Sequence, residues 1–275
     1  MSNNSSIGIR LFVSWCVLLL VTVTNRPTAA VASDPCPTSA DEIATDRPDV
    51  TNSSLVVPYA SLQAENGVDW TVDHGSDALN GTNTRLRLGI AHCTEFLIDV
   101  PSYFLALNGS QPSGFSDVVA SFKRQLAVPF GLDLSVTAGL GFPSGSIRVA
   151  GRGYQPYIES PWSYEITDAW KAVGMCTLTW FPSESSRNPT FQSTFSLERE
   201  FGPSADMFFE SVGDYSHQSP SQVLDTGATW RVTKTQQLDF HAGIGLNHSS
   251  VDHYFGLGYS FRVDRLFGGS VGNSP

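Results

Sequence analysis

Apolar and polar positions alternate along most of this chain with the two-residue period of β-strands. Segment 252–263 shows it clearly: His253, Phe255, Leu257, Tyr259, Phe261 and Val263 share one face, and glycine, serine and charged residues share the other. Helix-period patterns are absent. The alternation, bounded by turn-forming residues, predicts about twelve strands. Their expected ranges are Ser61–Trp70, Arg85–Ala91, Thr94–Val100, Ser116–Leu126, Leu132–Gly141, Tyr154–Ile166, Trp170–Trp180, Thr190–Glu200, Ala205–Val212, Val223–Thr233, Gln237–Asn247 and Asp252–Val263.

The connections between these strands alternate in length. Long polar connections are expected at Thr71–Thr84, Pro101–Phe115, Phe142–Gly153, Phe181–Pro189 and Gly213–Gln222. Short ones are expected at His92-Cys93, Ala127–Gly131, Thr167–Ala169, Phe201–Ser204 and Lys234–Gln236, and the last outer turn, His248–Val251, is also short. Outer-membrane barrels have short periplasmic turns and longer extracellular loops, whereas a soluble sandwich has no reason to sort its loops. The sequence therefore predicts an all-β, antiparallel, up-and-down transmembrane β-barrel whose apolar faces point to lipid.

The N-terminus has the layout of a secretory signal peptide. Arg10 precedes an apolar run from Leu11 to Thr24, and a small-residue cleavage site follows at Ala30-Val31-Ala32. The run is too short to span a bilayer comfortably, which takes about 20 apolar residues. We therefore expect residues 1–32 to be a signal peptide, 33–54 a periplasmic N-terminal lead, 55–263 the barrel and 264–275 a C-terminal tail.

The net charge and the cysteines limit which binding partners and which covalent or metal sites the protein can have. The formal charge of −10 becomes about −12 when the signal peptide, with its two arginines, is removed. An acidic chain repels phosphate backbones, so nucleic acid is excluded as a partner. Cys36, Cys93 and Cys176 remain in the exported chain, and their spacing matches no disulfide framework or metal motif. We expect the three cysteines to be incidental, although export would permit one bridge.

Charged strand residues are expected to face the lumen, because a charge on the lipid face costs about 2–4 kcal/mol near the bilayer midplane. A three-residue turn at Lys234–Gln236 would set Arg231 opposite Asp239 as an ion pair, and a four-residue turn at His248–Val251 would set His241 opposite Gly258. Such pairs either brace the wall or form a pore lining that selects solute charge. The candidate lumen-lining residues are Asp69, Arg85, Arg87, Glu95, Asp99, Asp117, Lys123, Asp133, Glu198, Glu200, Glu210, Asp225, Arg231, Asp239, His241, Asp252 and Arg262.

The sequence carries little that is typical of catalysis. It lacks HExxH and a phosphate-binding loop, and Gly141-Phe142-Pro143-Ser144-Gly145 resembles the G-x-S-x-G motif only superficially. His248 and His253 flank Asp252, but this spacing favours an exposed turn over a metal site. We expect no enzyme activity, no catalytic residues, no metal and no cofactor.

Several short motifs, in order, resemble one known family: the outer-membrane transporters named for the meta-pathway of phenol degradation. The resemblance extends from about Thr45 to Val263 and implies an outer-membrane barrel that passes small solutes, including hydrophobic or aromatic ones. One departure is that the chain continues past the last strand instead of ending on an aromatic residue, so that Phe261 or Phe267 replaces it or the tail extends into the periplasm. The motifs are Thr45-Asp46-Arg47-Pro48-Asp49, Gln63-Ala64-Glu65-Asn66-Gly67, Arg87-Leu88-Gly89-Ile90, Gly114-Phe115-Ser116-Asp117, Phe142-Pro143-Ser144-Gly145, Gln237-Leu238-Asp239 and Gly256-Leu257-Gly258-Tyr259-Ser260.

The expected function is passage of small solutes across the outer membrane, with membrane lipid, a small-molecule solute and the barrel-assembly machinery as partners. We also hypothesise that the N-terminal lead folds into the lumen, where Asp46, Arg47 and Asp49 meet its charges. Three alternatives stay open: a sealed structural or surface-adhesive barrel, a soluble periplasmic barrel that binds a ligand in an apolar interior, and a barrel hydrolase.

Overall fold

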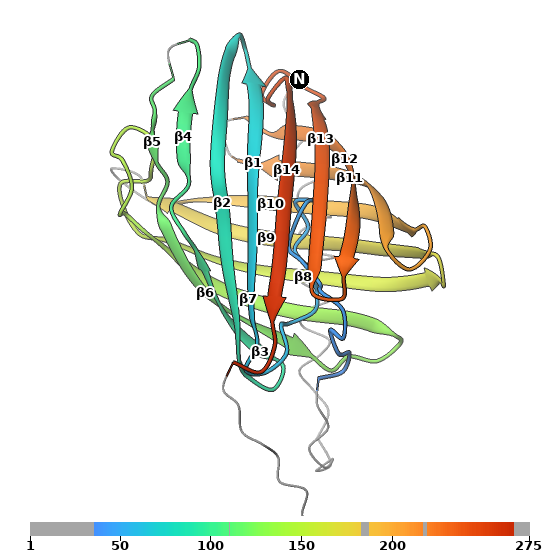
Figure 1. Cartoon of the computed structure of the whole chain (residues 1–275). Coiled ribbons are helices and arrows are strands. Elements are labelled where there is room, and N and C mark those ends of the chain that lie inside the picture. The colour runs from blue at the N-terminus through green and yellow to red at the C-terminus, as the bar shows by residue number, and fades with distance from the viewer. Residues whose placement is uncertain (1–35, 110, 183–186, 217–218, 267–275) are drawn as a thin grey trace, which may run out of the picture. The chain divides into compact units, whose positions relative to one another are not determined.

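The computed structural model describes residues 36–109, 111–182, 187–216 and 219–266, so the predicted signal peptide and Phe267 lie outside the described residues. No helix among these residues is long and apolar enough to cross a membrane. The fold is a single antiparallel sheet that closes on itself, because β1 pairs with both β14 and β2. Figure 1 shows the strands and, in blue, the N-terminal segment that precedes them. The strands are β1 (Leu62–Asp73), β2 (Ser76–Ala91), β3 (Thr94–Asp99), β4 (Tyr103–Ala106), β5 (Gly114–Phe115), β6 (Val118–Leu126), β7 (Leu132–Phe142), β8 (Gln155–Thr167), β9 (Trp170–Pro182), β10 (Arg187–Glu200), β11 (Ala205–Tyr215), β12 (Ser221–Thr233), β13 (Gln236–Gly245) and β14 (His253–Val263).

The fourteen strand segments make up the twelve strands of the barrel. β3 and β4 pair with β2 in one continuous register, with Asp99 opposite Arg85 and Ala106 opposite Ala78. Likewise β6 and β5 continue one register against β3 and β4. β3 with β4, and β5 with β6, are therefore each one strand with a short break. The predicted twelve-stranded up-and-down barrel is confirmed.

We call the rim where β1 begins and β14 ends the inner rim, and the opposite one the outer rim. Inner-rim turns span at most five residues, and outer connections reach twelve residues at 143–154. The prediction of a long first loop at Thr71–Thr84 is wrong, because β1 and β2 continue to a two-residue turn at His74-Gly75. Both turn residues have positive φ, 48° and 79°, as tight hairpins require. The polar residues that suggested a loop belong to strands that keep pairing. The last outer connection is longer than predicted, at 246–252.

The distribution of side chains is the reverse of that in a soluble barrel. Large apolar residues are exposed on the outside, with Leu257 at 68% and Phe209 at 62%. The six largest fully buried side chains are instead polar or charged, led by Arg87, Lys123 and Gln63. A soluble barrel that bound a ligand in an apolar interior would show the opposite facing. The structure contradicts that alternative and places lipid against the outer wall.

Candidate functional site

The N-terminal segment 36–61, which we call the plug, enters the lumen from the inner rim and returns to it. At the rim Arg262 donates to the backbone carbonyls of Ala40, Glu42 and Asp41 at 2.8, 3.0 and 3.1 Å. At the return, the amide of Ala60 donates to the carbonyl of Gly89 at 2.8 Å. The hypothesis that the lead folds into the lumen is therefore confirmed. The division at residue 54 is wrong, because 55–61 also belong to the plug and β1 begins at Leu62.

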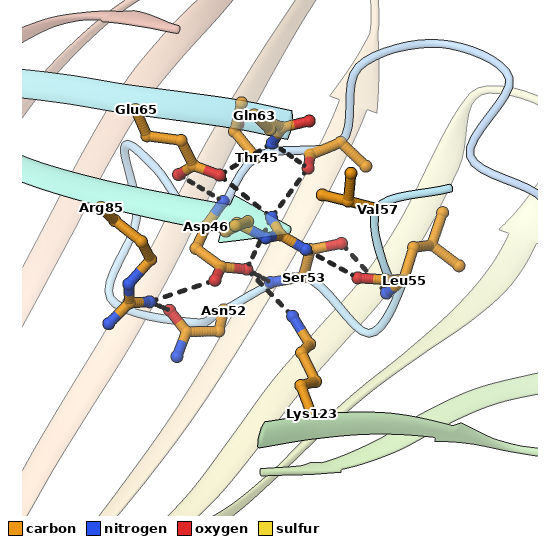
Figure 2. A network of polar contacts seen from close by, with 12 residues as sticks. Thr45, Asp46, Asn52, Ser53, Leu55, Val57, Gln63, Glu65, Arg85 and Lys123 are labelled. Carbon is orange, nitrogen blue, oxygen red and sulfur yellow. Dashed lines mark hydrogen bonds and ion pairs between the residues drawn. The ribbon is translucent and has the colours of Figure 1, made fainter. Parts of the chain in front are cut away.

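One carboxylate of the plug, Asp46, lies among three cations of the barrel wall. Its oxygens are 3.1 Å from Arg85, 3.2 Å from Arg87 and 3.1 Å from Lys123. Figure 2 shows the side chains of Arg85, on β2, and Lys123, on β6, pointing toward Asp46. Burial alone would raise the pKa of Asp46, but the charges of Arg87, Lys123 and Arg85 outweigh it and lower that pKa well below its ordinary value. Asp46 is thus ionised and paired at any physiological pH.

Arg87, on β2, connects the plug to the barrel wall and also connects neighbouring strands of the wall to one another. Its guanidinium pairs with Glu65 on β1 at 3.0 Å and with Glu95 on β3 at 2.9 Å. It also donates to the plug carbonyls of Ala44 and Leu55, each at 2.9 Å. All three charged side chains are fully buried. Buried charges persist only when paired and hydrogen-bonded, and here the plug provides part of that pairing.

A second plug residue, Arg47, packs against two glycines of the barrel wall. It pairs with Asp239 at 3.4 Å and approaches Asp69 at 3.8 Å. A Cβ atom at Gly67 would lie 2.2 Å from Cζ of Arg47, and one at Gly258 would lie 2.7 Å from its Nε. These two wall positions accept Arg47 because they lack side chains.

The opposite wall holds the plug through carboxylates. The backbone amides of Val50 and Thr51 donate to Glu210 at 2.7 and 2.9 Å, and the Asn52 amide donates to Glu159 at 2.8 Å. Asp49 also faces this acidic wall. Burial, then the negative charges of Glu210, Glu198 and Asp225, raise the pKa of Asp49 well above its ordinary value. Lys171 interacts with Asp49 but pairs more closely with Glu198, at 3.2 Å.

Two cavities of the lumen lie on either side of the plug. The outer one has a volume of about 730 Å³ and the inner one about 460 Å³. Arg47, Pro48, Asp49 and Asn52 line both, so a thin stretch of plug separates them. Five carboxylates and two cations line the outer cavity, and eight carboxylates and three cations line the inner one. A solute in either cavity therefore meets a net negative lining.

Most of the predicted lumen residues contact the plug or line one of these cavities. Asp225 instead pairs with His241 inside the barrel at 3.3 Å, and His241 also meets Asp69 at 3.2 Å. The assignment of Asp252 is wrong, because it lies exposed in the outer loop, where it accepts a hydrogen bond from the amide of His74. The residues with plug or cavity contacts are Asp69, Arg85, Arg87, Glu95, Asp99, Asp117, Lys123, Asp133, Glu198, Glu200, Glu210, Arg231, Asp239 and Arg262.

The predicted Arg231–Asp239 pair is also wrong. The turn at Lys234-Thr235 has two residues and the β12–β13 register shifts between Arg231 and Thr233, so Asp239 faces Thr229. Arg231 pairs instead with Asp206 at 2.6 Å and with Glu42 of the plug at 3.3 Å. The β13–β14 register differs by two residues from the expected one, because the connection spans 246–252 and not the four residues predicted, and His241 faces Gly256 rather than Gly258.

The sequence reasoning missed Gln63, Glu65, Glu159 and Lys171 as lumenal groups. Glu65 shares the parity of Asp69 on the same strand, so a signal was present. Glu159 lies on a strand whose prolines and aromatics obscure the alternation. Among the described residues, no group of three or more histidine, cysteine or acidic side chains is arranged to hold a metal. His248 lies 3.3 Å from His74 instead.

Comparisons with known proteins agree with this architecture. A family model described as "Putative MetA-pathway of phenol degradation" matches residues 45–263, and no curated protein matches the sequence. The NanC porin is 9% identical, with 74% of this chain and 100% of that chain covered and a TM-score of 0.54. The KdgM porin is 12% identical (72% and 98% covered, TM-score 0.49), and the CymD monoaromatic hydrocarbon channel is 10% identical (76% and 90% covered, TM-score 0.41). The likeness to the NanC porin shows a shared barrel fold.

Proposed function

The chain belongs to the family described by the MetA-pathway of phenol degradation, and from this premise we propose that it passes small solutes across the outer membrane past its plug. It is an outer-membrane β-barrel: the strands close, apolar side chains face lipid and charged side chains fill the lumen. In such barrels the short turns face the periplasm, which assigns the inner rim to that side.

The observation that carries the proposal is how the plug is held. Between residues 44 and 59, each hydrogen bond and ion pair described between plug and wall involves a side chain, as in Asp46 with Arg85 and Thr51 with Glu210. A strand inserted into the sheet would be held by a backbone ladder. Side-chain contacts in a polar, water-accessible lumen can be exchanged for water one at a time, so the plug can shift while the barrel stays closed.

The volumes of the two cavities support the proposal that the solutes are small. Each has a volume within or near the range of small-molecule sites, roughly 300–1,000 Å³. The family's description refers to phenol degradation, which supports aromatic compounds as the solute class. We propose no catalytic role, because the central charged groups Asp46, Arg87 and Lys123 are engaged in bracing the wall and the plug.

Liposome swelling tests the proposal. Vesicles that contain the mature protein are diluted into isosmotic phenol-sized aromatic solutes, small sugars or large oligosaccharides, and light scattering records entry. We expect faster swelling than in protein-free vesicles for the small solutes and none for the large ones. Swelling equal to that of protein-free vesicles for every solute, with a correctly folded barrel, would establish a sealed structural barrel instead.

A further inference from the structure

Two cysteines lie at the inner rim beside the point where the plug begins. Cys93 is the second residue of the two-residue turn that joins β2 to β3, with a φ of 57°. Its carbonyl accepts a hydrogen bond from the amide of Gln125 at 3.0 Å, which fixes the turn against the neighbouring strand. Cys36 is the first described residue of the plug segment, and both cysteines are partly accessible and unbridged in the structure.

The two thiols lie near each other, because Cys36 is among the groups that raise the pKa of the Cys93 thiol. Nearby contacts keep the segment there: Thr38 donates to Asp133 at the start of β7, and Arg262 holds the carbonyls of residues 40–42. The plug therefore presents Cys36 to Cys93 through its own folding.

We propose that Cys36 and Cys93 form a disulfide in the exported protein, a covalent link between the start of the plug and the barrel. The inner rim faces the periplasm, where disulfides form and persist. Cys176 is no competitor, since it lies within β9, separated from β3 by three strands of the sheet. This proposal is independent of solute passage.

The chemistry requires an oxidant. Two S–H bonds break and one S–S bond forms, while two electrons and two protons pass to the disulfide of an oxidising periplasmic protein, which becomes a dithiol. Burial, and then the neighbouring Cys36 thiol, raise the pKa of the Cys93 thiol to about 11. The thiolate fraction at neutral pH is then on the order of 1 in 10,000, so air oxidation of the folded protein is slow. We expect the link to depend on the protein oxidant.

The link would close a covalent loop from Cys36 through the plug, β1 and β2 to Cys93. Both ends of the plug would then be attached to the inner rim, one by the disulfide and the other by β1. Such a plug cannot leave the lumen as a free tail. Any opening must displace its middle, the stretch from Asp46 to Asn52 that separates the two cavities.

Mass spectrometry of the mature protein tests this. The protein is exported in a host with an intact periplasmic oxidant, extracted in N-ethylmaleimide without reductant, and digested with trypsin. Trypsin cuts after Arg85 and Arg87, between the two cysteines. We expect one linked peptide pair that separates on reduction, present in wild type and in Cys176→Ser and absent in Cys36→Ser and Cys93→Ser.

A second measurement asks whether the folded protein places the two thiols close enough to be linked, independently of whether the host supplies an oxidant. In a host that lacks the periplasmic oxidant, both cysteines should be alkylated, and an added disulfide oxidant should then form the link in the purified, folded barrel. Cys36 and Cys93 each alkylated in the oxidising host would overturn the proposal. A barrel that cannot be linked by added oxidant would also overturn it, as would a disulfide between two chains.

Discussion

Replacing Asp46 by asparagine should release the plug without changing the barrel. The substitution keeps the size of the side chain and removes the negative charge that Arg85, Arg87 and Lys123 share at 3.1 to 3.2 Å. Breaking a buried ion pair costs about 3–5 kcal/mol. The low end applies, because Arg87 keeps Glu65 and Glu95 as partners.

A loss of about 3 kcal/mol in plug docking changes the ratio of docked to displaced plug on the order of 100-fold. Planar-bilayer recording measures this as the open probability of single channels. Asp46→Asn should therefore open far more often than wild type, at the same unit conductance.

Asp41→Asn is the matched control. Asp41 lies exposed on the same segment and accepts a hydrogen bond from Ser39 at 2.9 Å, so this variant should behave as wild type. A heat-modifiability gel verifies that each barrel is folded. An open probability for Asp46→Asn within twofold of wild type, with a normal gel shift, would refute the reasoning that this cluster holds the plug.

Four further predictions follow from the lumen and the lipid face. Because burial and its acidic neighbours raise the pKa of Asp49, the protonated form favours docking; open probability should rise as pH increases through that pKa, and Asp49→Asn should remove this pH dependence. Both cavities are lined by more carboxylates than cations, so the reversal potential in a KCl gradient should show preference for K⁺ over Cl⁻; equal permeability would contradict this. Gly67→Leu should displace Arg47, at a cost of about 1.5–3 kcal/mol in lost charged hydrogen bonds, and raise the open probability without removing any charge; unchanged gating would show that Arg47 does not secure the plug. Leu257→Arg should lower the unfolding free energy in lipid by about 2–4 kcal/mol, as measured by urea titration, because its side chain faces the hydrocarbon.

Much of the wall was predictable because the alternation of apolar and polar residues has the same period as a strand. The lipid-facing row on β14 and the lumen-facing Arg85 and Arg87 follow from parity alone. Strand ends were harder to place. β1 and β2 extend to the turn at His74, where polar residues outside the apolar band give no signal that pairing continues.

Register and plug contacts could not be predicted for a different reason. A bulge near Arg231 moved the partner of Asp239, and nothing in the local sequence marks that bulge. The charges of the plug were visible as Asp46, Arg47 and Asp49, but which wall each one meets depends on how the chain crosses the lumen. Short-range patterns do not contain that long-range information.

The central claim is that a plugged barrel controls passage through its own lumen, and deletion of residues 36–54 tests it most directly. Single-channel conductance of the mature protein and of the deletion variant is recorded under identical conditions, with folding of both verified by heat-modifiability. We expect the deletion to join the two cavities and to produce a larger, persistently open conductance. Conductance unchanged by the deletion, in a folded barrel, would contradict the account.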